Sequence, residues 1–286
     1  MKFKDISPKA LAAWNPTLRA SVSAEDSAHT ITLTGFVGDE WVYDDYARPI
    51  TLARVDAALR SIGDNRATVY INSPGGSMFE GIAIYNRLRE HKAGVTIKVI
   101  GIAASAASVI AMAGDKREIA KSAFLMIHNC WSHIAGNRHE LLQAAEQFEE
   151  FDKSMAGIYA DATGIEFARA VELMNKESYL SGSTAVDLGF STSLMSSDEI
   201  ETDTSASAVA ANALKQLDVA LSKGGMPRSE RRKLLNDLKS SFEHQFEDGN
   251  DKPSAVVEGK PSAALDAATF NASAKLAKEL KEMVKL

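Results

Sequence analysis

Apolar residues follow two spacings along the first two-thirds of the chain, and the changes of spacing mark the expected elements. Short runs rich in β-branched residues predict strands, and apolar positions three or four residues apart predict helices between them. The expected strands cover residues 29–35, 67–72, 95–100 and 122–128, and the expected helices cover 55–62, 79–91, 103–113 and 137–163. Strands that alternate with helices form a largely parallel sheet, with the helices packed against it and right-handed connections between strands. The pattern therefore predicts an α/β fold.

The pattern changes after about Leu194. Residues 196–207 are polar and acidic, which is typical of a linker. Helical spacing returns at 208–221, 229–242 and 263–286, and a second polar stretch covers 247–261. These helices carry too few large apolar residues to form a core of their own. We therefore predict a folded domain over residues 1–195, followed over 196–286 by a linker and a mostly helical, flexible or disordered tail.

Composition narrows the class of protein. The chain has 286 residues and a formal net charge of -6, which gives no support for nucleic-acid binding. No apolar run is long enough to cross a bilayer, and residues 1–5 lack the apolar core of a signal peptide, so we expect a cytoplasmic protein without membrane contact. The single cysteine, Cys130, cannot form an internal disulfide. Because His128, His133 and His139 share no ligand spacing with cysteines or carboxylates, we expect neither a metal nor another cofactor.

Residues suited to acyl transfer occur in three separate segments. Ser105 lies among small residues, His128 ends an apolar strand, and Gly75 and Gly76 end another. A serine hydroxyl needs an imidazole to accept its proton during attack. Backbone N–H groups can bind the negative oxygen that attack creates, and glycines let the chain approach that oxygen. The helix expected after Ser105 begins at Ala106, whose N–H can point at the same oxygen.

Taken singly, each segment has a purely structural explanation. A serine in an alanine-rich helix is usually a packing residue, a histidine after an apolar run is usually a core residue, and a proline followed by two glycines forms a turn. In combination they indicate a serine hydrolase.

Four segments make the combination more specific. They are VYINSPGG at 69–76, GIAAS at 101–105, AFLMIH at 123–128, and SYLS with AVDLGF at 178–190. Together they resemble the ClpP family of self-compartmentalising serine peptidases, and the resemblance extends from about Thr32 to Leu194. Within that family, the chain is most similar to the phage and prophage branch, the head maturation proteases.

The resemblance implies a fold, a site and an assembly. The fold would be the ClpP/crotonase-like spiral of ββα units. Ser105 would be the nucleophile, His128 the general base, and the amides of Gly75 or Gly76 with Ala106 the oxyanion hole. The enzyme would be an ATP-independent endopeptidase that forms a ring-shaped homo-oligomer and acts on protein or peptide substrates. In the phage branch these substrates would be capsid or scaffold proteins, cleaved while the prohead matures.

The resemblance also implies an aspartate, shortly before residues 179–181, that orients the histidine. We place Leu173 at this position, and a leucine cannot orient an imidazolium. Glu172, Asn175 and Glu177 lie nearby, and an asparagine can fix the tautomer of an imidazole. We choose Asn175 as the third catalytic residue, with a Ser-His dyad as the alternative.

Other interpretations remain open at this point. Crotonase-type enzymes share the fold and bind acyl-CoA thioesters, but they need carboxylates near the catalytic helix, where Ala106, Ala107 and Ser108 stand. A relic of a peptidase could serve only as a scaffolding or assembly protein. Cys130 could pair with His128, although a buried cysteine is usually inert. The tail could recruit the protease into an assembling shell and be cut off there, or it could be a solvated extension.

Overall fold

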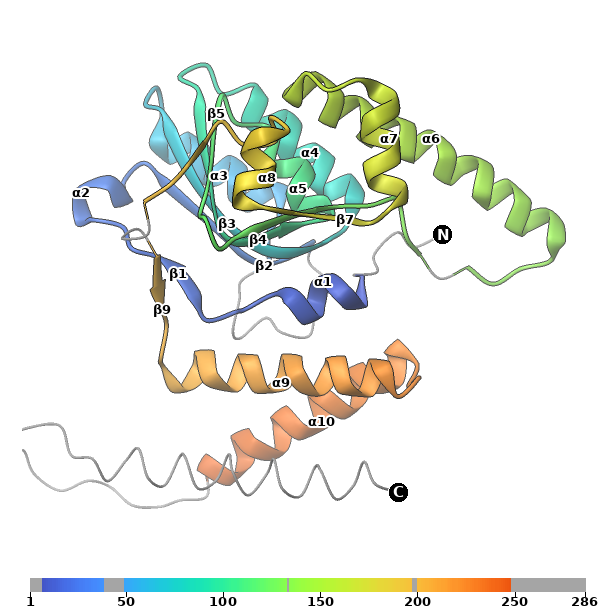
Figure 1. The fold of residues 1–286 in the computed structure, drawn as a ribbon. Helices are drawn as coiled ribbons and strands as arrows, with labels where there is room; N and C mark the ends of the chain where they lie inside the picture. Colours follow the sequence, from blue (N-terminus) through green and yellow to red (C-terminus); the bar gives the residue numbers. More distant parts are fainter. Residues whose placement is uncertain (1–6, 39–48, 133, 197–199, 248–286) are drawn as a thin grey trace, which may run out of the picture. The chain divides into compact units, whose positions relative to one another are not determined.

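The computed structural model describes residues 7–38, 49–132, 134–196 and 200–247 (Figure 1). The chain divides into two compact units, Met1–Lys239 and Ser240–Leu286. The first unit holds the central sheet and every predicted site residue. None of the helices within the described ranges is long and apolar enough to span a bilayer.

A mostly parallel sheet forms the centre of the first unit. Its main path runs through β2 (Thr30–Val37), β3 (Ala67–Gly76), β4 (Val95–Ala104), β5 (Lys116–Ile119) and β8 (Ser193–Leu194), all parallel to their neighbours. A further strand, β6 (Phe124–Ile127), pairs in parallel with the end of β4 and antiparallel with β7 (Ser178–Ser181). This mixed α/β architecture with a largely parallel sheet confirms the predicted fold class.

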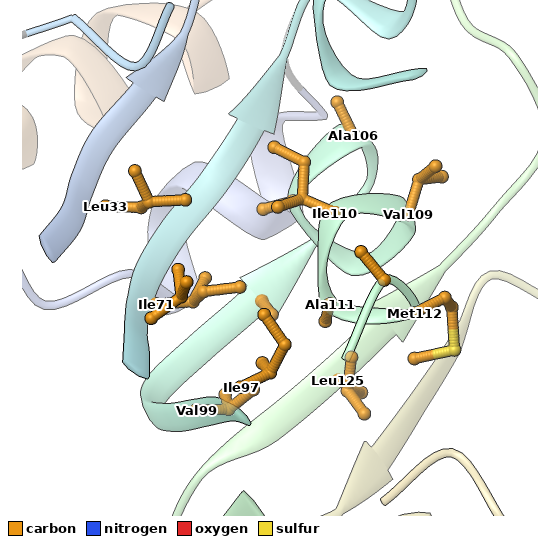
Figure 2. Packing of buried hydrophobic residues seen from close by; sticks show 14 of the residues in the cluster. Leu33, Ile71, Ile97, Val99, Ala106, Val109, Ile110, Ala111, Met112 and Leu125 are labelled. Atoms are coloured by element: carbon orange, nitrogen blue, oxygen red, sulfur yellow. The ribbon is translucent and has the colours of Figure 1, made fainter. Parts of the chain in front are cut away.

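Three helices between these strands cover one face of the sheet. They are α3 (Leu52–Ile62), α4 (Met78–Arg89) and α5 (Ala106–Ala111) (Figure 1). Figure 2 shows Ile71 and Ile97 of the sheet in the same apolar cluster as Val109 and Ile110 of α5. Burying side chains of this size contributes roughly 1.5–3 kcal/mol each. The short helix α5 is buried along its whole length, which explains its run of alanines.

The longest helix, α6 (Arg138–Thr163), matches the predicted helix over 137–163. Asn137 and Glu140 form a capping box at its start, and Gly164 ends it in the left-handed conformation, with φ of 80°. Its second half is buried at Met155, Ala156 and Tyr159. Its first turns leave the side chains of Leu141 and Leu142 exposed at 45% and 55%. After α6 the chain forms α7 (Phe167–Asn175), β7 and α8 (Gly182–Asp187).

The N-terminal residues cover the opposite face of the sheet. They form α1 (Pro8–Ala13), β1 (Leu18–Ala20) and α2 (Ala24–Ser27). A second apolar cluster joins Leu11 and Trp14 to Phe36, Ile102 and Met126 of the sheet. Helix α1 therefore packs directly on the strands that lead to the predicted site.

The chain after residue 195 differs from the prediction of tethered helices. Strand β9 (Ile200–Thr202) pairs antiparallel with β1, and α9 (Ala206–Lys223) packs against α1. The last described helix, α10 (Arg228–Glu247), contributes Leu235 to the second cluster, where it is 3% exposed. Residues 200–239 thus belong to the first compact unit, because their apolar side chains are buried against the N-terminal segment instead of forming a core of their own. The helix predicted over 263–286 lies outside the described residues.

Candidate active site

Ser105 occupies a sharp turn between strand β4 and helix α5. Its φ and ψ are 55° and -125°, a conformation that a residue with a side chain rarely adopts. Its N–H donates to the carbonyl of Met126 at 2.9 Å, and its own carbonyl accepts from the N–H of Ser108 at 2.9 Å. These two hydrogen bonds attach the strained turn to β6 on one side and to α5 on the other. The Ser105 side chain does not cap α5, so its hydroxyl is available to other partners.

His128 lies beside this turn. Its Nε2 atom is 2.8 Å from Oγ of Ser105. Burial lowers the pKa of His128 from its usual value, and the negative charge of Glu177 opposes part of that shift. The imidazole is therefore neutral at neutral pH and can accept a proton from the hydroxyl. The structure thus brings together the predicted nucleophile and the predicted base.

The predicted glycine pair ends strand β3 beside Ser105. Gly75 and Gly76 have φ of 95° and 149°, in the region that favours glycine. A Cβ on Gly75 would lie 2.7 Å from Cβ of Ser105, and a Cβ on Gly76 would lie 2.1 Å from the carbonyl oxygen of Val37. Both positions therefore need glycine for steric reasons.

The two glycines are placed differently with respect to the reacting groups. The N–H of Gly75 donates to Oγ of Ser73 at 3.1 Å. Gly76 lines a small pocket together with Ser105, Ala106 and His128. Ala106 is the first residue of α5, so its N–H has no acceptor within the helix. Of the two glycines, Gly76 is thus the better candidate for the oxyanion hole.

The remaining walls of this pocket are mostly apolar. Met78 begins α4, Met155 comes from α6, and Cys130 and Trp131 follow β6. The pocket opens beside the Ser105 hydroxyl, so a group bound there would lie next to the reacting oxygen.

Asn175 is hydrogen-bonded to Asn129, the residue that follows His128. Its side-chain oxygen accepts from the amide of Asn129 at 2.8 Å, and the residue is exposed. Leu173 is 6% exposed and belongs to the apolar core. Glu172 pairs with Lys176 and Arg169, which lower its pKa to about 2. Leu173 and Glu172 thus have partners of their own, whereas Asn175 contacts the residue next to His128 in the chain.

Glu177 neighbours His128, because Ile127 at the end of β6 lies opposite Ser178 at the start of β7, and its charge raises the pKa of the imidazole. The two groups interact electrostatically, so each shifts the pKa of the other. Glu177 has φ of 49°, and this left-handed residue turns the chain between α7 and β7. Glu177 is therefore a second candidate for the third catalytic residue, beside Asn175. The signal available in the sequence was an acidic residue directly before the strand over 178–181.

Cys130 does not resemble an activated nucleophile. Burial, and then the charge of Asp152, raise the pKa of its thiol to about 12. Its sulfur lies 3.0 Å from the sulfur of Met78, and its backbone N–H donates to Oδ1 of Asp152 at 2.6 Å. The thiol therefore stays protonated, and the alternative of a Cys-His pair loses its chemical basis.

The described ranges contain no group of three His, Cys, Asp or Glu side chains that could hold a metal ion. His128 contacts Ser105 and His139 contacts Arg138. His133 lies outside the described residues.

Comparison with known proteins gives matches in the same region. A sequence model of the family described as Clp protease matches residues 50–198, which is 149 of the 286 residues. The ATP-dependent Clp protease proteolytic subunit of Chlorella vulgaris is 33% identical over 123 residues, covering 42% of this chain and 61% of the relative. The subunit of the same name from Ligilactobacillus salivarius is 35% identical over 129 residues, covering 44% of this chain and 66% of the relative. The chain thus spans somewhat less than two thirds of the length of these curated relatives.

Proposed function

The chain belongs to the Clp protease family, and on that premise we propose that it is a serine endopeptidase that uses Ser105 and His128. One observation carries the proposal, the 2.8 Å contact between Oγ of Ser105 and Nε2 of His128 at a strained turn. A hydroxyl in contact with a neutral imidazole is the pairing that nucleophilic catalysis by serine requires.

The reaction would proceed through an acyl-enzyme. Nε2 of His128 takes the hydroxyl proton as Oγ of Ser105 bonds to the peptide carbonyl carbon. The oxygen of that carbonyl becomes negative, and the N–H groups of Gly76 and Ala106 are the candidates that bind it. The imidazolium then gives its proton to the leaving amine, and the peptide C–N bond breaks. Water, deprotonated by the same imidazole, attacks the acyl carbon, and the bond from that carbon to Oγ breaks as the imidazolium returns the proton to Ser105.

The charge of Glu177 supports this cycle. His128 becomes positively charged twice per turnover, and a nearby carboxylate stabilises that charge. We propose Glu177 as the third catalytic residue. Before the reaction begins, the imidazole of His128 is neutral, because burial lowers its pKa more than the charge of Glu177 raises it.

The pocket beside Ser105 suggests which bonds are cut. Its apolar walls at Met78, Trp131 and Met155 favour an apolar side chain next to the scissile bond. Methionine side chains adapt to different shapes, so discrimination among apolar side chains is expected to be modest.

We also propose a ring-forming assembly that processes capsid or scaffold proteins in a phage prohead. The support for the assembly is the exposed apolar start of α6, where Leu141 and Leu142 are available for contact between subunits. The support for the substrate is the similarity of the motifs to the head maturation branch. The chain also continues for 88 residues after the family match, which ends at residue 198.

A fluorophosphonate probe tests the proposed function, because it reacts covalently with an activated serine. We expect wild type to be labelled, with the label located on Ser105 by peptide mass. The variants Ser105→Ala and His128→Ala should remain unlabelled, while Ser61→Ala, which removes an exposed hydroxyl on α3, should label like wild type. An unlabelled wild type would favour a scaffolding protein or a crotonase-type enzyme. A label on another serine would identify that serine as the nucleophile in place of Ser105.

A further inference from the structure

Helix α1 reaches the carboxylate of Glu177, which neighbours His128 because Ile127 of β6 lies opposite Ser178 of β7. The hydroxyl of Ser7, the N-cap of α1, donates to Oε1 of Glu177 at 3.0 Å. The ammonium of Lys9 donates to Oε2 at 2.7 Å. Both carboxylate oxygens of Glu177 thus have a partner from a segment about 170 residues earlier in the chain.

The two contacts differ in their exposure to solvent. Ser7 is 6% exposed, so its hydrogen bond is shielded from water. The side chain of Lys9 is 72% exposed and that of Glu177 is 25% exposed. An ion pair at the surface contributes little to stability and weakens with salt. Ser7 therefore fixes the position of the carboxylate, and Lys9 mainly adjusts the charge that His128 experiences.

The other end of α1 is fixed just as firmly. The indole N–H of Trp14 donates to the carbonyl of Asn72 at 3.1 Å, and Trp14 is 2% exposed. Asn72 lies on β3, four residues before Gly76. A single short helix thus connects the turn of Glu177 with the strand that carries the glycine pair.

Helix α9 holds α1 in this place. The ammonium of Lys215 donates to the carbonyl of Trp14 at 2.8 Å and approaches that of Ala12 at 3.5 Å. Lys215 is only 8% exposed. A buried ammonium is costly unless its hydrogen bonds are satisfied, and the last carbonyls of a helix are favourable acceptors for a cation. Lys215 lies beyond residue 198, where the family match ends.

We propose that Ser7 and Lys9 are positioning residues that fix Glu177 against His128, and that Lys215 fixes α1 and so the position of both. The effect on the rate of hydrolysis rests on the proposed function, whereas the effect on His128 does not. The consequence is that the segment after the family match takes part in forming the catalytic site.

The charges around Glu177 give this proposal a readout that does not depend on activity. Within the described residues, the titratable groups that interact with the charge of Glu177 are Lys9 from α1, His128 after β6 and Tyr179 on β7. The carboxylate favours the protonated imidazole, and the ammonium of Lys9 shields the carboxylate. Removing Lys9 should therefore raise the pKa of His128, and removing the charge of Glu177 should lower it.

The first experiment is an NMR titration of the histidine rings in the full chain, with His128 assigned from the variant His128→Ala. We expect Lys9→Met to raise the pKa of His128 and Glu177→Gln to lower it, while Lys9→Arg leaves it near the wild-type value. The control Lys153→Met removes a surface cation that pairs with Glu149 and Glu150 and should have no effect. An unchanged pKa in both Lys9→Met and Glu177→Gln overturns the proposal.

The second experiment measures kcat and KM on a peptide substrate and separates the roles of Ser7. Losing a hydrogen bond to a charged group corresponds to roughly a tenfold loss, so Ser7→Ala should lower kcat about tenfold with KM little changed. Ser7→Thr should restore the rate. Ser7→Asp keeps a good N-cap but repels Glu177, so it should be at least as slow as Ser7→Ala. If Ser7→Asp is instead as fast as wild type, the hydroxyl acts only as a helix cap and the proposal fails.

The test of Lys215 completes the design. Lys215→Met should lower kcat by severalfold in protein that is still folded by circular dichroism, and Lys215→Arg should recover most of the loss. Faster hydrolysis in Ser7→Ala or Lys215→Met would mean that α1 restrains the enzyme, and it would overturn the positioning role.

If wild type itself neither hydrolyses peptides nor reacts with a fluorophosphonate while the pKa shifts of His128 are seen, the proposed function fails and the positioning of Glu177 stands.

Discussion

The Nε2 atom of His128 lies 2.8 Å from Oγ of Ser105, although the two residues are 23 positions apart in the chain. The contact follows from the pairing of two parallel strands, since Ala104 at the end of β4 lies opposite Met126 of β6. The N–H of Ser105 is bonded to the carbonyl of Met126, so the turn that presents the hydroxyl is anchored to the strand that presents the imidazole. In parallel sheets the carboxyl ends of neighbouring strands form such sites.

Glu177 should matter more for catalysis than Asn175. Glu177→Gln removes the charge that stabilises the imidazolium, and we expect kcat to fall roughly tenfold or more. Asn175→Ala loses a surface hydrogen bond to Asn129 and should change kcat by less than about twofold. Steady-state kinetics with Glu172→Gln as a matched control would decide this, because Glu172 pairs with Arg169 and Lys176. A greater loss in Asn175→Ala than in Glu177→Gln would favour Asn175 as the third residue.

The pH profile of kcat/KM should reflect the burial of His128. A protonated imidazole cannot accept the proton of Ser105, so activity is lost as the pH falls through the pKa of His128. Burial lowers that pKa, and the midpoint of the acid limb should therefore lie below about 6.5, the usual value for histidine. Values of kcat/KM measured on one peptide across the acid and neutral pH range would give this midpoint, with folding followed in parallel by fluorescence. A midpoint clearly above that value would contradict the buried, neutral imidazole.

Gly76 should tolerate no side chain. In Gly76→Ala, a Cβ 2.1 Å from the carbonyl oxygen of Val37 forces the backbone to move, at a cost of about 1–3 kcal/mol in the free energy of unfolding. Gly157 lies within α6, where a Cβ would meet nothing within 4 Å, so Gly157→Ala should stabilise the protein by about 0.5–1 kcal/mol. Urea unfolding of both variants tests the contrast. If the two substitutions changed the free energy of unfolding equally, β3 would not approach β2 as closely at Gly76 as the structure shows.

Tyr159 should support the strained turn from α6. Its hydroxyl lies 2.8 Å from Oγ of Ser108, which in turn donates to the carbonyl of Ser105 at 2.6 Å. Tyr159→Phe keeps the ring and removes one hydrogen bond, so we expect a loss of about 1 kcal/mol in stability and a severalfold lower kcat. Tyr85→Phe, on the half-buried side of α4, is the control. A kcat equal to that of wild type would exclude a role of Tyr159 in holding Ser105.

Local patterns are sufficient to predict most of the central fold and the proposed pair of Ser105 and His128. The strands and helices from residue 29 to 163 repeat simple apolar spacings, and the serine, histidine and glycine positions lie at the ends of those strands. The choice between Asn175 and Glu177 as the third residue depends on a turn at Glu177, whose φ of 49° has no signature in the spacing of apolar residues.

The N-terminal helix and its contacts could not be predicted from the sequence. Helix α1 is six residues long, and its position depends on contacts with residues far along the chain, such as Glu177 and Lys215. A pattern along the chain carries no information on such distant pairs. For the same reason the sequence predicts a tethered helix where α9 packs against α1.

The most direct test of a serine peptidase at Ser105 is the intact mass of purified wild type and Ser105→Ala after several hours of incubation, alone and with casein as an unfolded substrate. We predict casein fragments, or a shortening of the chain at its C-terminal end, in wild type only. Unchanged masses in both proteins, or identical fragments from both, would contradict peptide-bond cleavage by Ser105.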